Sequence, residues 1–536
     1  MRLRDEWSFL LAVLAGTALR LDQIGIQIPL DDEWHALHAV ERFGYAHVAT
    51  HFGWTDYCIP LTLFDKLIAD TVGLSELWLR LPVVVAGLVS LVLMPLVVRP
   101  WVGRETSSVF AWLLAVSPLH VYFTRYARPY SIALLLAFLA VFALPRATLA
   151  GGRGWRWVYA GAAVLAPYFH LTTLPVVLLP LAIVWVVRWR APRREEGLST
   201  RTLSIVTLAV AAGLGVLLGP PMLVDHQALA YKAGRGEVHA EMLAGAASLM
   251  AGSARPGVIV VTGLAVVGGA VALGRRHPRL LALLGAVAAL AIGMPLATHP
   301  ALIELPIVFV RYALIVLPLA LLLAACAIEW AVARAGPRNL AAASVAGPLI
   351  AVVLVALGPL PHIDRRPNAW TNHPAFQYSY VAPPCDPGYV VLPFYALLAR
   401  EPPGSERLVE APWLFAAAGN RFHCAQLRHR QDVRIGFVGG VFDGAAKQGL
   451  PRPGELPILA QPHRYRFRSF VHLGDAEGLR RSGATLVVLH KRIEKEMTGA
   501  ATDSGLGIEP WIARYRASYG APVYEDEWMA VFRVAG

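Results

Sequence analysis

The stretch "IPLDDEWHALH", residues 28–38, places three carboxylates in a row directly after the first apolar segment of the chain. Asp31, Asp32 and Glu33 carry like charges, and crowding such groups raises the pKa of at least one of them. A carboxylate with a raised pKa is suited to take a proton from a hydroxyl group. The stretch therefore predicts a general base, and the alternative for it, taken alone, is a solvated helix end.

A metal site is a second alternative for the same stretch. On a helix, Asp31, His35 and His38 share one face, because their spacing is i, i+4 and i+7. Carboxylate and imidazole groups are ordinary ligands of divalent cations. The candidate metal ligands are Glu33 and His35, together with His170, which on its own is more typical of a satisfied helix-end histidine. No cofactor is predicted with certainty, and a divalent metal ion is the one candidate.

Arginines supply the other half of the candidate chemistry. The segment "SPLHVYFTRYARPYS", residues 117–131, carries Arg125, Arg128 and Tyr130, and "LPIVFVRYALIVLP" carries Arg311. Guanidinium groups match the oxygens of a phosphate, and charged groups near the hydrocarbon of a membrane are costly unless they function. These residues predict a site for the phosphate of a lipid-linked donor. The alternative for the first two arginines is a side chain that merely reaches the membrane interface.

The elements that must position these residues are mostly membrane helices. The 536 residues are 56% hydrophobic and 16% charged, with mean hydropathy +0.52. Soluble domains are roughly 45–50% apolar and about 25% charged. Apolar runs of the length that crosses about 30 Å of hydrocarbon predict about eleven crossings. They lie near residues 7–29, 82–99, 106–124, 130–145, 157–171, 173–188, 204–222, 256–274, 280–297, 312–331 and 340–359.

The basic residues predict how these crossings are oriented. Arginine-rich loops alternate with arginine-poor ones, and they lie at residues 99–104, 146–156, 188–201, 275–279 and 334–338. By the positive-inside rule, the N-terminus is cytoplasmic and residues 31–33 face outward. The same placement explains the net charge of +12 without nucleic-acid binding. An uncleaved first helix is favoured over a signal peptide, because no small-residue cleavage site follows it.

The composition changes after Pro361. Residues 362–536 are polar and contain short β-like runs: "GYVVLPFY", "ATLVVLHK" and "EWMAVFRV". We expect a transmembrane domain over residues 1–361 and a soluble α/β domain outside the membrane over residues 362–536. Cys385 and Cys424 would then meet an oxidising compartment and form a disulfide. If the crossing count is off by one, they remain two unpaired thiols.

Several motifs occur in an order that resembles a known family. The Asp32-Glu33 pair follows the first span, Arg80 and Pro82 open the second, and Ser117-Pro118 with Arg128-Pro129-Tyr130 follows the third. Arg311-Tyr312 begins a late span. Over residues 20–145 the chain resembles the GT-C-type integral membrane glycosyltransferases, in the branch of protein O-mannosyltransferases and lipid A aminoarabinose transferases. Two positions depart from that pattern: Cys58-Ile59-Pro60 replaces His-Pro-Pro, and Tyr126 replaces a glutamate.

The resemblance implies a polytopic helical GT-C-like fold and an enzyme that moves a sugar from a polyprenyl phosphate to an acceptor hydroxyl at the outer face of the cell membrane. It implies that Asp32 is the base acting on a lipid, glycan or protein acceptor. Residues Asp31 and Glu33 would orient that acceptor or share a metal. Two other classes remain: a transporter or flippase of lipid-linked sugars, and a non-catalytic assembly subunit in cell-envelope glycan synthesis. Against a transporter, the chain has no matched halves with helix-breaking pairs near midspan.

Overall fold

The computed structural model describes helices over most of the chain and a sheet near its C-terminus. The residues it describes are 6–22, 24–25, 32–53, 58–149, 152, 154–190, 198–230, 233–334, 340–363, 391–411, 422–437, 470–474, 476–494, 501–503 and 508–534. The chain divides into two compact units. One comprises residues 1–22, 44–63 and 80–361, and the other comprises residues 23–43, 64–79 and 362–536.

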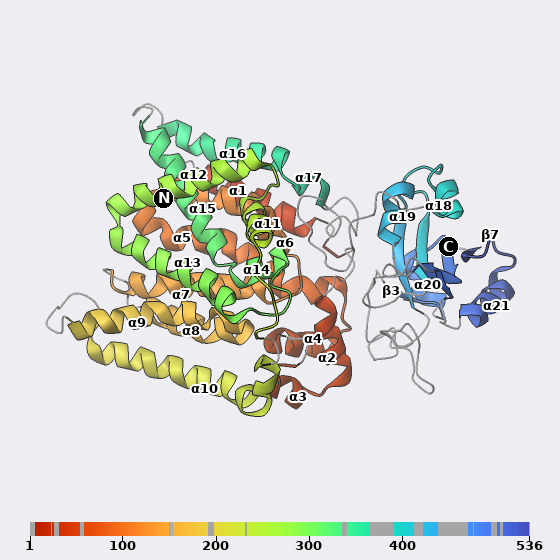
Figure 1. The fold of residues 1–536 in the computed structure, drawn as a ribbon, viewed down its shortest axis with the longest axis horizontal. Helices are drawn as coiled ribbons and strands as arrows, with labels where there is room; N and C mark the ends of the chain where they lie inside the picture. The colour runs from red at the N-terminus through yellow and green to blue at the C-terminus, as the bar shows by residue number, and fades with distance from the viewer. Residues whose placement is uncertain are drawn as a thin grey trace. The chain divides into compact units, whose positions relative to one another are not determined.

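Helices form most of the described residues before residue 364 (Figure 1). They are α1 (Trp7–Leu21), α2 (Glu33–Arg42), α3 (Tyr45–Thr50), α4 (Ile59–Thr71), α5 (Glu76–Val116), α6 (Pro118–Phe123), α7 (Tyr130–Ala147), α8 (Trp155–Phe169), the 3-10 turn η2 (Leu171–Thr173), α9 (Leu174–Arg190), α10 (Thr200–Ala230), α11 (Ala240–Ala251), α12 (Pro256–Arg276), α13 (Pro278–Thr298), α14 (Pro306–Tyr312), α15 (Val316–Arg334), α16 (Leu340–Leu357) and α17 (Leu360–Ile363).

The helix α5 contains two of the predicted crossings. Its backbone leaves the helical region at Gly103, where φ is +80°. The two halves lie side by side, because Ser107 Oγ donates a hydrogen bond of 2.8 Å to the carbonyl of Pro95. Glycine permits this reversal within one residue, since a side chain at positive φ would be strained.

Each of the eleven predicted segments contains a helix or, in α5, half of one, although two predicted ends are wrong. The first helix ends at Leu21 rather than at residue 29, because Asp22 leaves the helical conformation. The segment predicted over 106–124 ends at Val116. There Ser117 takes an extended conformation and its side chain accepts from the His120 amide, which begins α6. Hydroxyl side chains at this position start helices in the same way.

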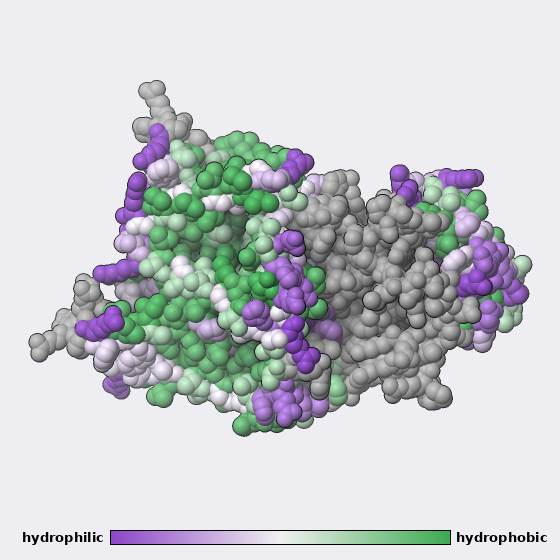
Figure 2. All heavy atoms as spheres, in the orientation of Figure 1, coloured by the Kyte–Doolittle hydropathy of each residue, from purple (hydrophilic) through white to green (hydrophobic). Residues whose placement is uncertain are grey.

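The chain is a multi-pass membrane protein. Seven helices among the described residues are long and apolar enough to cross a membrane: α5, α7, α10, α12, α13, α15, and α9 with η2. Figure 2 shows apolar side chains over the visible face of these helices and hydrophilic ones gathered at the helix ends. In α7, 78% of the residues of the apolar span are buried, whereas in α12 only 17% are. Helix α7 therefore lies in the interior of the unit, and α12 lies at its surface.

The C-terminal part folds as a sheet between helices (Figure 1). Its elements are α18 (Pro393–Leu398), β1 (Arg407–Ala411), α19 (Phe422–His429), β2 (Asp432–Phe437), β3 (Phe470–His472), α20 (Ala476–Ser482), β4 (Leu486–His490), β5 (Arg492–Glu494), β6 (Ala501–Asp503), α21 (Ile508–Tyr519), β7 (Tyr524–Glu525) and β8 (Met529–Arg533). The strand order is β3-β2-β1-β4-β8-β7. Strands β3, β2, β1 and β4 run parallel to one another. Strand β8 is antiparallel to both β4 and β7.

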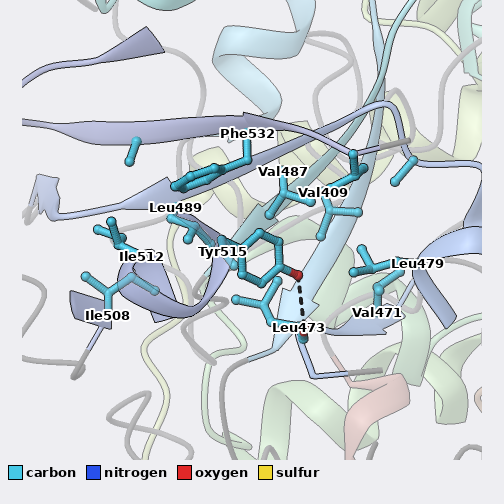
Figure 3. Close-up of a cluster of buried hydrophobic side chains, with 14 residues drawn as sticks. Val409, Val471, Leu473, Leu479, Val487, Leu489, Ile508, Ile512, Tyr515 and Phe532 are labelled. Atoms are coloured by element: carbon cyan, nitrogen blue, oxygen red, sulfur yellow. Dashed lines mark hydrogen bonds between the residues drawn. The ribbon is translucent and has the colours of Figure 1, made fainter. Parts of the chain in front are cut away.

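Alternate residues of β1, β4 and β8 face opposite sides of this sheet, as the period of two requires. On one side, Val409, Val487 and Phe532 pack against α20 and α21, where the hydroxyl of Tyr515 donates to the carbonyl of Leu473 at 2.8 Å (Figure 3). On the other side, a second apolar cluster packs against α18 and α19. The predicted α/β character of this region is thereby confirmed.

Two of the three β-like runs are strands, and one is not. "ATLVVLHK" contains β4, and "EWMAVFRV" contains β8. The described part of "GYVVLPFY" instead begins helix α18, with Pro393 in its first turn. Proline is favoured there, because its fixed φ is already helical and its missing N–H would have no partner in the helix. Cys385 lies outside the described residues, as does the side chain of Cys424, so the disulfide stays a prediction.

Candidate functional site

Aromatic and cationic side chains meet around one pocket in the compact unit of residues 1–22, 44–63 and 80–361, called the helical unit below. Tyr130 begins α7, His170 directly follows α8, and Arg311 and Tyr312 end α14. The His170 ring centre lies 5.4 Å from that of Tyr130 and 5.9 Å from that of Tyr312. The Arg311 guanidinium carbon lies 6.0 Å from the Tyr130 ring centre and 5.5 Å from the Tyr312 ring centre. A cation over aromatic faces at such distances is attracted electrostatically.

The rest of the pocket is mainly apolar. It is open on one side, and the space among its lining atoms, together with the solvent in front of them, is about 360 Å³. The remaining lining residues are Ala133, Leu134, Ala137, Thr172, Thr173, Val176, Leu314 and Ile315. A pocket with a cation at one place and hydrocarbon elsewhere matches a ligand that has a charged head and an apolar body.

The orientation of His170 is fixed by its own turn. Its backbone N–H donates to Ala166 at 2.8 Å, which completes α8. Its Nδ1 lies 2.5 Å from the hydroxyl of Thr172, and the Thr173 hydroxyl donates to its carbonyl at 2.9 Å. The turn therefore presents the imidazole beside Tyr130 as a ring held in place.

The turn before α7 carries the two other predicted arginines. Ser117 and Pro118 start α6, and the chain then turns through residues 124–129 into α7. The side chains of Arg125 and Arg128 are almost fully buried. Arg125 Nη1 donates to the carbonyl of Leu19 at 3.0 Å, at the end of α1. These arginines are thus part of the packed interior and do not extend to a surface as the interface alternative predicted.

The carboxylate stretch lies in the other compact unit, at the start of α2. Asp32 precedes the first residue of α2 but forms no side-chain capping bond. Its Oδ1 instead lies 3.2 Å from Nε2 of His35, one turn later. Glu33 is fully buried. The interpretation as a solvated helix end does not fit Glu33. Asp31 lies outside the described residues.

Sequence reasoning missed a second buried carboxyl group, Asp65 on α4. Its side chain is 2% exposed, and its Oδ1 accepts no hydrogen bond within the described part of the chain. Burial and, second, the charge of Glu33 raise the pKa of Asp65 well above its ordinary value. The next residue, Lys66, contacts the Asp70 carboxylate at 3.3 Å and donates to the carbonyl of Val40 at 3.4 Å. One sequence signal was available: Asp65 interrupts the apolar face of "LTLFDKLIA".

The structure thus brings together some of the predicted residues. Tyr130, His170 and Arg311 share a pocket, and the pocket adds Tyr312, which the motif had marked only as a span start. Arg125 turns toward the end of α1. No three His, Cys, Asp or Glu side chains lie close enough to hold a metal ion in the part of the chain that the structure describes. Glu33 and His35 belong to one compact unit and His170 to the other, so the metal set of these three residues stays a prediction.

Comparisons with known proteins give distant structural neighbours. No family model matches the chain, and no curated protein matches it. The solved structures include ArnT from Cupriavidus metallidurans in the apo state, at 14% identity and TM-score 0.47, covering 98% of this chain and 96% of that one. The same protein bound to undecaprenyl phosphate aligns at 14% identity and TM-score 0.44, covering 98% and 97%.

A third neighbour is the Archaeoglobus fulgidus oligosaccharyltransferase in complex with Zn and sulfate. It aligns at 13% identity and TM-score 0.31, covering 80% of this chain and 62% of that one.

Proposed function

We propose that this chain is a GT-C-type glycosyltransferase that moves a sugar from a polyprenyl phosphate to an acceptor hydroxyl. The observation that carries the proposal is the pocket at the start of α7. There Arg311 lies against the rings of Tyr130 and Tyr312, above a lining of alanine, valine and leucine side chains. A phosphate with an isoprenoid tail has the matching arrangement of charge and hydrocarbon.

The transfer itself needs charge neutralisation more than acid catalysis. The acceptor oxygen attacks the anomeric carbon, the bond from that carbon to the phosphate oxygen breaks, and its electron pair stays on the phosphate. Arg311, with Arg128 and Arg125, stabilises the negative charge that develops there. The acceptor proton passes to the carboxylate of Asp32. A single displacement of this kind inverts the anomeric configuration.

The proposed orientation follows from the arginine-rich loops. They support a cytoplasmic N-terminus and a C-terminal domain, residues 362–536, outside the membrane. The transfer then occurs at the outer face. A reporter fused after Gly536 should read as extracytoplasmic, and a cytoplasmic reading would overturn this orientation.

The test is a transfer assay on purified protein in lipid nanodiscs. A panel of polyprenyl-phosphate pentoses and hexoses is offered, and released polyprenyl phosphate is measured. Asp32→Asn should lower turnover by about a hundred- to ten-thousand-fold, the usual worth of a general base, and leave donor binding unchanged. Asp70→Asn is the matched control, because Asp70 is a partly exposed carboxylate of the same unit that pairs with Lys66.

Two outcomes would count against the proposal. If the wild type binds no polyprenyl phosphate and cleaves no member of the panel, the chain is not this kind of transferase. If the wild type moves the intact lipid-linked sugar across a vesicle membrane without cleaving it, the transporter class replaces the enzyme. Near-normal turnover in Asp32→Asn would move the base elsewhere, with Asp31 as the next candidate.

A further inference from the structure

Arg20 is a fully buried cation at the end of α1. Its Nη1 donates to the carbonyls of Gly16 at 2.7 Å and Ala115 at 3.1 Å. Its Nη2 donates to the carbonyl of Leu114 at 3.1 Å and lies 2.6 Å from Nδ1 of His120. One guanidinium therefore joins the end of α1, the end of α5 and the start of α6.

The contact with Arg20 decides where the proton of His120 lies. A guanidinium has donors only, so Nδ1 of His120 must accept in the 2.6 Å contact. A neutral imidazole that accepts at one nitrogen carries its hydrogen on the other. His120 therefore presents Nε2–H as a donor, and Arg20 fixes this tautomer. The backbone of His120 is held as well, because its N–H donates to Ser117 Oγ.

That donor has no protein acceptor within the described residues. The His120 side chain is 1% exposed, and its Nε2 finds no hydrogen-bond partner there. Buried polar groups nearly always have a partner, since an unsatisfied one is unfavourable. A fixed N–H that is buried and unsatisfied is therefore suited to an oxygen atom supplied by a ligand.

The surroundings of His120 favour a negatively charged ligand. Arg125 donates to the carbonyl of Leu19, the residue before Arg20, and both arginines are buried. The direct contacts of Arg20 described above are three carbonyl oxygens and an imidazole, and none of them is a carboxylate. Arg128 follows in the same turn. Bringing an anion to such a place relieves the repulsion between the cations.

We propose that His120 donates a hydrogen bond from Nε2 to a phosphate oxygen of the substrate, and that Arg20 is the positioning residue that holds its ring in the donating tautomer. This inference rests on the proposed function and adds a hydrogen-bond donor to the proposed phosphate-binding residues Arg125 and Arg128. It places His120, which lies on α6 just before the turn of residues 124–129, in contact with the ligand and assigns to Arg20 of α1 the role of orienting its ring.

Asparagine and glutamine variants separate the two nitrogens of the ring. The amide oxygen of Asn can take the place of Nδ1, so His120→Asn keeps the acceptor for Arg20 and loses the distal donor. The amide nitrogen of Gln can take the place of Nε2, so His120→Gln keeps the distal donor and loses the acceptor. The probes are a long-chain polyprenyl phosphate and inorganic phosphate, each titrated into full-length protein in nanodiscs.

The proposal predicts that His120→Asn binds polyprenyl phosphate about tenfold or more weakly, the usual loss for a hydrogen bond to a charged group, with little change in melting temperature. His120→Gln should bind within a few-fold of wild type but melt at a lower temperature. A purely structural histidine predicts the reverse, with His120→Asn like wild type in both measurements. That result would overturn the inference. If inorganic phosphate shows the same pattern, the site recognises the phosphate group without the isoprenoid chain.

A measurement on the wild-type protein guards against variants that do not fold. With 15N-labelled histidine, NMR should show His120 in the Nε2–H tautomer, and Arg20→Lys should mix the two tautomers. Polyprenyl phosphate should shift the Nε2–H signal. If the wild type binds polyprenyl phosphate and this signal does not move, the inference fails while the proposed function stands. If the wild type binds no polyprenyl phosphate, the proposed function fails first.

Discussion

The helical unit and the C-terminal sheet each bury a charged side chain, and they satisfy it differently. Glu410 of β1 accepts from the Tyr395 hydroxyl at 3.1 and 3.0 Å and lies 2.7 Å from Nε2 of His490 on β4. All three groups are buried. Arg20, in contrast, is held by carbonyl oxygens and an imidazole, beside a second cation. Glu410 therefore contacts hydrogen-bond donors of its own domain, whereas the contacts of Arg20 given above include no anion.

The largest predicted effect concerns Glu410, whose contacts all lie within the C-terminal domain. Glu410→Ala should destabilise the sheet by about 3–5 kcal/mol, because it leaves the buried His490 and Tyr395 without their shared acceptor. Hydrogen exchange in the full-length protein should show lost protection in β1 and β4. Binding of polyprenyl phosphate should not change.

Tyr395→Phe is the milder companion of Glu410→Ala. It removes one hydrogen bond and leaves the contact between Glu410 and His490, so about 0.5–1.5 kcal/mol is expected. If Glu410→Ala instead preserves β1 and β4 but abolishes transfer, this cluster is functional and the contrast with Arg20 is wrong.

The second prediction concerns the cation of the aromatic pocket. Arg311→Ala should lower kcat/KM for a polyprenyl-phosphate sugar by about a hundred- to a thousand-fold, as for other groups that stabilise developing negative charge. The protein should keep its melting temperature, since Arg311 lines a pocket and lies against the rings of Tyr130 and Tyr312. Arg311→Lys should recover part of the loss. A variant that melts early but transfers normally would make Arg311 structural, like Glu410.

The smallest effect concerns pH and the buried carboxyl group of Asp65. Its pKa is raised in the folded chain, so its contribution to stability is present below the unfolded value of 3.8 and is lost as the pH rises through the folded value. The wild type should therefore melt at a lower temperature at pH 8 than at pH 5. Asp65→Asn should flatten that difference, because an amide does not ionise. Equal pH dependence in the two proteins would show that Asp65 titrates normally.

The sequence predicted the helices well, because length and apolarity suffice to find them. The reversal at Gly103 lies between two arginines of a loop that the positive-inside rule had marked. The sequence also predicted that Tyr130 and Arg311 belong to one site, because two short motifs fixed their places relative to the spans. These features depend on local composition and on the order of motifs along the chain.

What the sequence could not supply is contact between distant residues. Arg20 and His120 are 100 positions apart, and no motif in the sequence linked them. Glu410 and His490 meet because β1 and β4 are neighbours in a particular register, which no pattern in either strand reveals. The run "GYVVLPFY" was misread because its composition suits a strand, while its proline suits a helix start.

The reversal of the chain at Gly103 in α5 also affects where proteases can cleave the protein. A protease needs several residues of exposed, extended chain, and such stretches occur mostly in loops and near termini. Between the halves of α5, one glycine makes the turn, and Ser107 is tied to Pro95 across it. Limited proteolysis should therefore leave both halves of α5 in a single fragment, so that two membrane crossings migrate on a gel as one covalent piece.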